Sequence, residues 1–194
     1  MTLKKPTWRE SIQCIKADIT QYADSQDNLW VQLVKNLYSH PSFYGVLFYR
    51  LGRWARTVRP ALLGRPLYYL YCILYPLVRS YSGLELRART QIGPGLCILH
   101  FGPTVIHPDT VMGKNITILP GVTIGAARGG TPHLENNIHI GSGAIIIGPV
   151  NVGQGASIGA GAVVTKDVPE QCTVVGVPAR PVKEHPLSAP ENPV

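Results

Sequence analysis

The chain has 194 residues, with 20 glycines, 17 prolines and a formal net charge of +7, so its length allows one large domain or two small ones. The charge lies in the first half: residues 1–90 carry 13 Lys/Arg against 5 Asp/Glu, a net +8, and residues 91–194 carry 5 against 6, a net −1. No nucleic-acid-binding motif accompanies the basic half, so we expect a solvated helical surface there and no nucleic-acid partner.

Four scattered cysteines include no C-x-x-C pair, so nothing predicts a disulfide framework or a zinc site. This cysteine usage fits a reducing compartment. The N-terminus is polar and begins a capped helix, which does not resemble a signal peptide. We therefore predict a cytoplasmic protein.

The first third of the chain shows helical spacing of apolar residues. The segment Thr7-Trp-Arg-Glu10 is a capping box, which predicts a helix over residues 8–23. The same pattern predicts a second helix over 28–38. Pro41 suits the first turn of a third helix, and Pro66 opens a fourth.

The fourth predicted helix contains the most apolar stretch, residues 67–78, between Arg65 and Arg79. Twelve residues are too few to span a bilayer, so we expect a buried helix. Contact with a membrane surface is a less favoured alternative, since Tyr and Arg residues flank the apolar ones. Residues 1–83 are thus predicted to form an all-helical cap domain.

The rest of the chain is organised around a six-residue period, clearest in residues 134–168. The first position of each hexapeptide is aliphatic, and the fifth is small or aliphatic: Leu134, Ile140, Ile146, Val152, Ile158 and Val164, then Ile138, Ala144, Val150, Ala156, Ala162 and Val168. A period of six indicates a parallel β-helix, in which three hexapeptides form one coil and the aliphatic residues face the axis. Each buried aliphatic side chain contributes roughly 1.5–3 kcal/mol.

The period continues upstream with two breaks. The count slips by two residues between Ile98 and Ile106, and a longer break occupies residues 125–133. Because functional sites are often found where a local rule fails, we look for chemistry in these breaks. His100 lies in the first of them. The β-helix domain is predicted to span residues 84–183, and the Pro-rich tail, 184–194, to be disordered.

In these features the chain resembles the serine acetyltransferase family of hexapeptide-repeat acyltransferases. The hexapeptide repeat, the run Ile158-Gly-Ala-Gly-Ala-Val-Val-Thr-Lys-Asp-Val-Pro169 with Gly176-Val-Pro-Ala-Arg180, and the cap motif Phe48-Tyr-Arg-Leu-Gly-Arg-Trp54 carry the resemblance. It covers roughly residues 8–183. It implies a left-handed β-helix and direct transfer of an acetyl group from acetyl-CoA to a hydroxyl group.

The resemblance implies that His100 is the general base. The position that matches the family's orienting Asp is Glu85, which keeps the charge and the acceptor atoms. A positioned base contributes typically 10²–10⁴-fold to such a reaction. A carboxylate on the other ring nitrogen fixes the tautomer. Cys97 is interpreted as strand packing, because direct transfer needs no thiol nucleophile.

The resemblance also implies a coenzyme A site. Its pantetheine groove would be lined by Ser142, Ala160 and Thr165. The phosphates of the nucleotide end would meet the cations of Lys166, Arg180 and Lys183.

Three positions depart from the family pattern for the acceptor. Serine-specific members carry an Asp before the catalytic histidine, where this chain has Leu99. They also carry an Arg-His pair that falls on Gly130 and Thr131 here, with His133 after Pro132. Thr131 and His133 are therefore the candidate substrate-binding residues. The acceptor is L-serine, as in the family, or alternatively a sugar hydroxyl of a capsule or exopolysaccharide precursor.

Two further readings of the same scaffold remain open. One is a metal-dependent carbonic anhydrase-like enzyme using His100, His133 and His139, although the six-residue spacing of the last two places them on successive sides; we expect no metal. The other is a catalytically inactive assembly module. By resemblance the chain forms a homotrimer, possibly paired through the caps, in which His100 of one subunit faces the coenzyme groove of the next.

Overall fold

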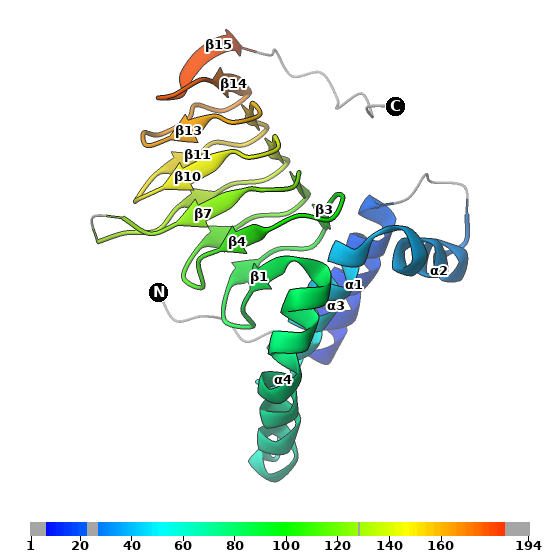
Figure 1. Ribbon diagram of the computed structural model, residues 1–194. Helices are drawn as coiled ribbons and strands as arrows, with labels where there is room; N and C mark the ends of the chain where they lie inside the picture. Colours follow the sequence, from blue (N-terminus) through cyan, green and yellow to red (C-terminus); the bar gives the residue numbers. More distant parts are fainter. Residues whose placement is uncertain (1–6, 23–26, 128, 185–194) are drawn as a thin grey trace.

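The computed structural model describes residues 7–22, 27–127 and 129–184, which form a helical cap followed by a solenoid of short strands (Figure 1). In this part of the chain the cap consists of α1 (Trp8–Gln21), α2 (Leu29–Ser39), α3 (Pro41–Ala55) and α4 (Ala61–Ser82). The tail predicted to be disordered lies, apart from Glu184, outside the described residues.

Local capping chemistry sets the starts of the first two helices. The side chain of Thr7 accepts a hydrogen bond from the backbone N–H of Glu10, and the Glu10 carboxylate accepts one from the backbone N–H of Thr7. The predicted capping box is therefore confirmed. Asn28 caps α2 by accepting hydrogen bonds from two backbone N–H groups of the first turn.

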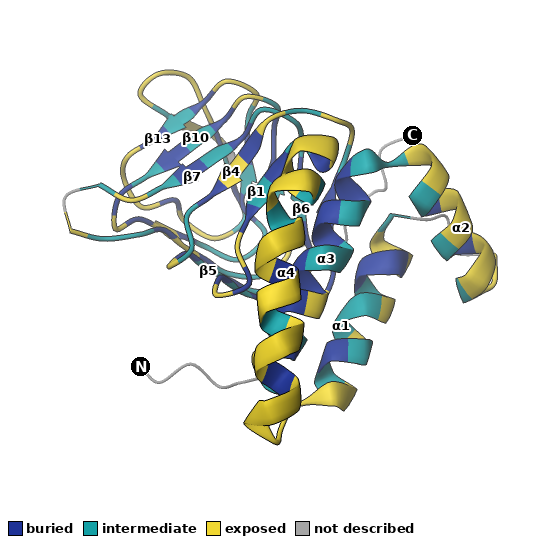
Figure 2. Cartoon of the chain, turned by 60° about the horizontal axis from the view of Figure 1, so that its bottom comes forward, coloured by how far each residue is buried: buried dark blue, intermediate teal, exposed yellow. Residues whose placement is uncertain are grey.

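The fourth helix differs from the sequence prediction in extent and in burial. It begins at Ala61 and continues through Pro66 and Pro76. Its inner face lies against α3 so closely that a Cβ on Gly52 would be 2.4 Å from the Tyr71 ring. The prediction of a buried helix was wrong, because this one narrow face holds α4 on the cap while the rest is exposed (Figure 2).

The solenoid has three faces, each a sheet of stacked strands (Figure 1). In hydrogen-bonding order, sheet A contains β1 (Leu84–Leu86), β4 (Thr104–Ile106), β7 (Thr123–Gly125), β10 (Ile145–Ile147) and β13 (Val163–Val164). Sheet B contains β2 (Gln91–Ile92), β5 (Val111–Met112), β8 (His133–Leu134) and β11 (Asn151–Val152). Sheet C contains β3 (Leu96–Ile98), β6 (Ile116–Ile118), β9 (His139–Ile140), β12 (Ser157–Ile158), β14 (Cys172–Val175) and β15 (Arg180–Glu184).

The order of the strands makes the solenoid a parallel β-helix. Successive strands belong to sheets A, B and C in turn, and every pair within a sheet is parallel except β14 with β15. The antiparallel β14–β15 hairpin ends the stack. The predicted parallel β-helix is thus confirmed.

The predicted inward positions form the core of the coil. Aliphatic residues at the first position of each hexapeptide are at most 5% exposed, in the first coils as in the last: Leu86, Ile92, Ile98, Ile106, Met112, Ile118, Ile124, Leu134, Ile140, Ile146, Val152, Ile158 and Val164. The small fifth-position residues Ala144, Ala156 and Ala162 are fully buried. Both breaks in the period therefore leave the inward register of the following strands intact.

A buried ion pair joins the cap to the first coil. The guanidinium of Arg50 donates two hydrogen bonds to the carboxylate of Asp18, at 2.7 and 3.0 Å. The same carboxylate accepts hydrogen bonds from the backbone N–H groups of Gly95 and Leu96. Burial raises the pKa of Asp18, and Arg50 and the two amides oppose this effect.

The same guanidinium also satisfies backbone carbonyls of the coil. Arg50 donates to the carbonyl oxygens of Ile92 and Gly93, at 2.8 and 2.6 Å. The Tyr49 hydroxyl donates to the carbonyl of Thr90 at 2.9 Å. The helical cap and the β-helix are therefore joined by buried polar contacts as well as by apolar packing.

Candidate functional site

One edge of the β-helix carries several of the predicted site residues. We call it the C–A edge, because it consists of the turns that lead from sheet C to sheet A: residues 99–103, 119–122, 141–144 and 159–162. The turns are stacked by backbone hydrogen bonds, from the Gly143 N–H to the Pro120 carbonyl at 2.9 Å and from the Gly161 N–H to the Ser142 carbonyl at 2.8 Å.

His100 lies in the first turn of the C–A edge, where the sequence period slips. The segment from Ile98 to Ile106 is two residues longer than the corresponding segments of the later coils, and both isoleucines remain in the core. The side chain of His100 is exposed, and its backbone adopts the left-handed conformation, with φ at 60°. Such a conformation is uncommon for a residue other than glycine and occurs often at functional sites.

The cap holds the strand that leads into this turn. The hydroxyl of Tyr22 donates to the carbonyl of Ile98 at 3.1 Å and accepts from the N–H of Ile98 at 2.8 Å. The hydroxyl of Ser42 donates to the same carbonyl. Burial raises the pKa of Tyr22 well above its ordinary value, so its hydroxyl remains a donor at neutral pH. Sequence analysis missed Tyr22 and Ser42, since no local pattern pairs a helix residue with a strand so far along the chain.

A second histidine lies next to this turn. His40 joins α2 to α3, and its ring contacts that of Tyr22 with centroids 5.2 Å apart. Its Nδ1 atom is buried and has no hydrogen-bond partner among the described residues. Burial, followed by the proximity of His100, lowers the pKa of His40, which favours a neutral imidazole beside the predicted base.

Glu85, the predicted partner of His100, lies in β1 next to the C–A edge. Its carboxylate accepts a hydrogen bond from the guanidinium of Arg79 in α4, at 3.1 Å. Between the described side chains of Glu85 and His100 there is no hydrogen bond. One carboxylate oxygen, Oε2, is therefore engaged by α4 in this conformation.

Ser142 and Ala160 lie above His100 on the same edge. They belong to the third and fourth turns, so three coil spacings, about 14 Å, separate Ala160 from His100 along the edge. Ala160 is exposed. The glycines that follow them, Gly143 and Gly161, have φ values of 68° and 67°, and a Cβ on either would meet nothing within 4 Å. The upper C–A edge thus presents backbone and small side chains to its surroundings.

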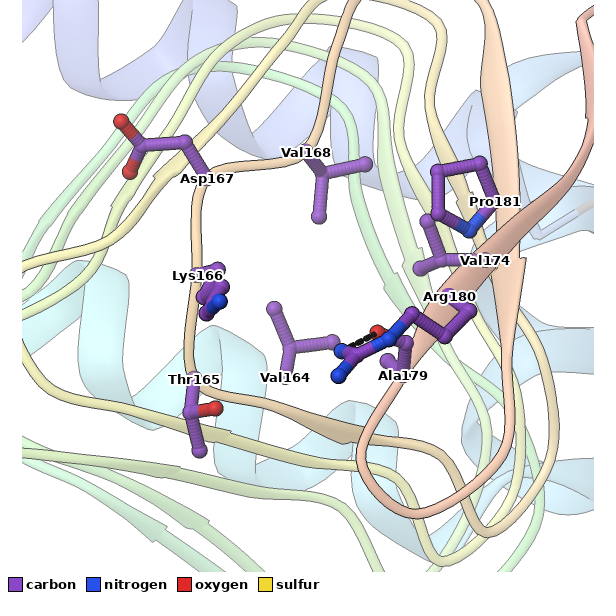
Figure 3. Close-up of a pocket in the computed structure, with 9 residues that line it drawn as sticks. All are labelled: Val164, Thr165, Lys166, Asp167, Val168, Val174, Ala179, Arg180 and Pro181. Atoms are coloured by element: carbon purple, nitrogen blue, oxygen red, sulfur yellow. Dashed lines mark hydrogen bonds between the residues drawn. The ribbon is translucent and has the colours of Figure 1, made fainter.

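A cavity of about 240 Å³ lies at the C-terminal end of the coil (Figure 3). The side chains of Val164 and Val168 point into it, whereas that of Asp167 points away. Three predicted coenzyme-binding residues, Thr165, Lys166 and Arg180, are among those that line it. The sixth, Lys183, lies in β15 opposite Thr173.

Thr131 and His133, the predicted acceptor-binding residues, lie away from His100 in the single chain. Thr131 belongs to the long turn from β7 to β8, which extends outward from the coil in Figure 1, and its hydroxyl donates to the carbonyl of Asp109 at 3.1 Å. His133 is exposed at the start of β8 in sheet B. The second break in the period is therefore this turn, on a different edge of the β-helix.

The described residues contain no group of three His, Cys, Asp or Glu side chains that could hold a metal ion. His100, His133 and His139 lie on the C–A edge, on sheet B and on sheet C. Burial and, to a lesser extent, Asp18 raise the pKa of the Cys97 thiol to about 12. A thiolate nucleophile at Cys97 is therefore disfavoured at neutral pH.

Several known proteins similar to this chain are serine acetyltransferases. The serine acetyltransferase of Bacillus pumilus is 38% identical over 136 residues, which cover 68% of this chain and 63% of that protein. The serine acetyltransferase of Helicobacter pylori J99 is 35% identical over 147 residues, which cover 74% of this chain and 82% of that protein. The chain thus spans less than two thirds of the first of these relatives. No family model matches the chain.

Solved structures agree with this likeness. The crystal structure of Neisseria gonorrhoeae serine acetyltransferase in complex with serine superposes with a TM-score of 0.73 at 30% identity, covering 91% of this chain and 70% of that one. The match extends over the cap and the solenoid. It confirms the predicted fold class, a mainly β, left-handed parallel β-helix with an N-terminal helical cap.

Proposed function

Because this chain belongs to the serine acetyltransferase family, we propose that it transfers an acetyl group from acetyl-CoA to the hydroxyl of L-serine. The observation that carries the proposal is the shared position of His100, Ser142 and Ala160 on the C–A edge, below a cavity lined by Lys166 and Arg180. The product, O-acetylserine, would serve cysteine synthesis in the cytoplasm.

In the proposed reaction, His100 removes the proton from the acceptor hydroxyl as its oxygen attacks the thioester carbonyl. The tetrahedral intermediate collapses with cleavage of the carbon–sulfur bond, and the imidazolium returns its proton to the departing thiolate. A positioned base of this kind contributes typically 10²–10⁴-fold. The exposed side chain of His100 is open to both substrates on the C–A edge.

We further propose that Glu85 orients the imidazole of His100. The arrangement is supported by the position of β1 beside the edge and by the second oxygen of the carboxylate, for which the described residues give no hydrogen bond. The carboxylate would keep Nδ1 protonated and Nε2 free to act as base, and would stabilise the imidazolium. Arg79 would hold Glu85 in place from α4.

Acetyl-CoA would lie along the C–A edge. Ala160 and the glycines beside it leave space for the narrow pantetheine arm, and Ser142 and Thr165 would flank it. The phosphates would lie near Lys166, Arg180 and Lys183, where charge-assisted hydrogen bonds are strong. Acetyl-CoA is thus a substrate held by cations at one end and presented to His100 at the other.

The acceptor would be held partly by a neighbouring subunit. Thr131 and His133 are remote from His100 in one chain, and residues of the C–A edge such as His100 and Ala160 are exposed. In a trimer of parallel β-helices in which the C–A edge faces a neighbour, the long turn of that neighbour would approach His100.

Co-expression of two variants tests whether neighbouring subunits share one acceptor site. Co-expression of His100→Ala with His133→Ala should restore part of the wild-type activity that each variant lacks alone, because mixed trimers contain some sites with both histidines intact. A monomeric mass in sedimentation equilibrium would contradict the proposal. Full activity of His133→Ala alone would remove this residue from the acceptor site.

The acceptor itself is identified by release of coenzyme A. Purified protein is supplied with acetyl-CoA and either L-serine or a panel of sugars and nucleotide sugars, and the acetylated product is identified by mass spectrometry. We expect release with serine and formation of O-acetylserine. Release with a sugar alone would overturn serine as acceptor, and would instead explain Leu99 and Thr131 at the positions where serine-specific members carry charged residues.

A further inference from the structure

The outer face of α4 is an apolar surface that the packing of the described chain leaves uncovered. Its exposed side chains recur at helical spacing: Leu63, Leu70, Ile73, Leu77 and Tyr81. Ile73 is 71% exposed and Leu77 is 69% exposed. Figure 2 shows α4 exposed along nearly its whole outer side, and Figure 1 shows its N-terminal half projecting beyond the rest of the molecule. Contiguous exposed apolar surface of this kind marks an interaction site.

Around this face the cationic side chains outnumber the carboxylates. Arg65 and Arg79 are the charged residues within α4, which contains no acidic residue. Arg56 lies over the ring of Tyr68, and Arg87 lies 6.0 Å from the ring of Tyr75, so cations also flank the helix from outside its own sequence. Of these arginines, Arg79 has a carboxylate partner, in Glu85. Four arginines therefore lie in or beside a helix whose outer face is apolar.

These charges argue against self-association through α4. Two copies of the helix packed face to face would bring arginines together with no carboxylate from either helix. An anionic phospholipid surface offers acyl chains to the apolar residues and negatively charged headgroups to the arginines.

The packing of α4 also defines how it would meet a membrane. Among the described residues, α4 is the one helix that is long and apolar enough to cross a bilayer. However, its inner face is fixed to α3 by the contact of Tyr71 with Gly52, and α3 carries the buried Arg50 that bonds to the first coil. Crossing a bilayer would break these contacts, whereas lying in the interface leaves them intact.

We propose that the outer face of α4 docks on an anionic phospholipid membrane, with the helix lying in the plane of the interface. Ile73 and Leu77 would enter the acyl boundary, and Arg56, Arg65 and Arg87 would contact the headgroups. This inference does not depend on acetyl transfer. It concerns where the protein acts, and it reverses the expectation that membrane contact is the less favoured alternative.

Vesicle binding tests the proposal on the full chain. The protein is sedimented with vesicles of phosphatidylcholine alone and of phosphatidylcholine mixed with phosphatidylglycerol. We expect binding to the mixed vesicles, weaker binding to phosphatidylcholine, and a loss of at least about tenfold in the partition coefficient for Ile73→Glu. Arg65→Gln should weaken binding about fivefold.

Val34→Glu is the matched control, because Val34 is 65% exposed on α2 and the change adds the same charge to another cap helix. Circular dichroism and thermal unfolding of each variant establish that it is folded, and Ile73→Ser provides a milder change. Absence of binding to mixed vesicles would overturn the proposal, as would an equal loss in Val34→Glu. Dissociation of an oligomer by Ile73→Glu without any vesicle binding would show that a second copy covers α4 instead.

Discussion

Two hydroxyl groups of the helical cap hold the backbone just before His100. Replacing Tyr22 by Phe leaves the N–H of Ile98 without its acceptor, and an unsatisfied buried group costs about 1–3 kcal/mol. We therefore expect Tyr22→Phe to destabilise the protein by that amount in urea unfolding and to lower kcat by displacing the His100 turn. Tyr38→Phe, at a position 92% exposed, is the control. Equal stability of both variants would contradict this role for Tyr22.

Ala160 provides a separate test of the coenzyme path. Ala160→Trp fills the space along the C–A edge without entering the core, because the position is exposed. The variant should raise the KM for acetyl-CoA about tenfold, equivalent to about 1.4 kcal/mol, with an unchanged melting temperature. Glu170→Trp places the same ring at an exposed turn between sheets B and C. If it raises KM as much, the pantetheine arm does not follow the C–A edge.

The buried ion pair of Asp18 and Arg50 joins α1 and α3 to the first coil of the β-helix. Asp18→Asn leaves the guanidinium without its counter-charge, which typically costs 3–5 kcal/mol. We expect a loss of this size in the free energy of unfolding. Asp27→Asn removes a carboxylate from the exposed pair with Lys35, where the expected cost is below about 1 kcal/mol. Equal effects of the two substitutions would contradict the proposed role of the buried pair.

The sequence predicted the strands of the β-helix more completely than the packing of the helices. The six-residue period is a local pattern with an inward-facing residue in every hexapeptide. It therefore predicted the stacked sheets, the residues that face the core and the turn that bears His100. The position of α4 depends on a contact between Tyr71 and Gly52, and the pairing of Asp18 with Leu96 spans most of the cap. Such contacts have no local signature. The sequence also placed the start of this helix at Pro66, whereas α4 begins five residues earlier, at Ala61.

The site could be predicted in part for the same reason. Ser142 and Ala160 occupy equivalent places in successive coils, so the period alone places them on one edge with the turn of His100. The pairing of Glu85 with Arg79 depends on where α4 ends, which the period does not describe. His40 and Tyr22 lie near His100 but belong to the helical cap. There the spacing of apolar residues predicts only which face of a helix is buried.

Two half-buried histidines make the stability of the whole molecule depend on pH. Burial lowers the pKa of His139, and burial together with His100 lowers that of His40, below the ordinary value of 6.5. The unfolded chain then binds more protons than the folded one below that pH. Stability is fully present above pH 6.5 and falls as the pH decreases from 6.5 toward the folded pKa values.

Urea unfolding at about pH 7.5 and about pH 5.5 measures this effect. We expect a lower free energy of unfolding at the acidic pH, and a smaller difference in the double variant His40→Gln/His139→Gln. An undiminished difference in the double variant would assign the pH dependence to other groups.

We propose that the C–A edge is an acetyl-transfer site with His100 as its base. The most direct measurement is the rate of coenzyme A release from acetyl-CoA with saturating L-serine, for the wild-type chain, His100→Ala and the control His107→Gln, a histidine in a turn between sheets A and B. We expect a loss of about 10²–10⁴-fold in kcat for His100→Ala, with little change in KM or melting temperature, and near-normal activity of the control. Retention of wild-type kcat by folded His100→Ala would contradict it.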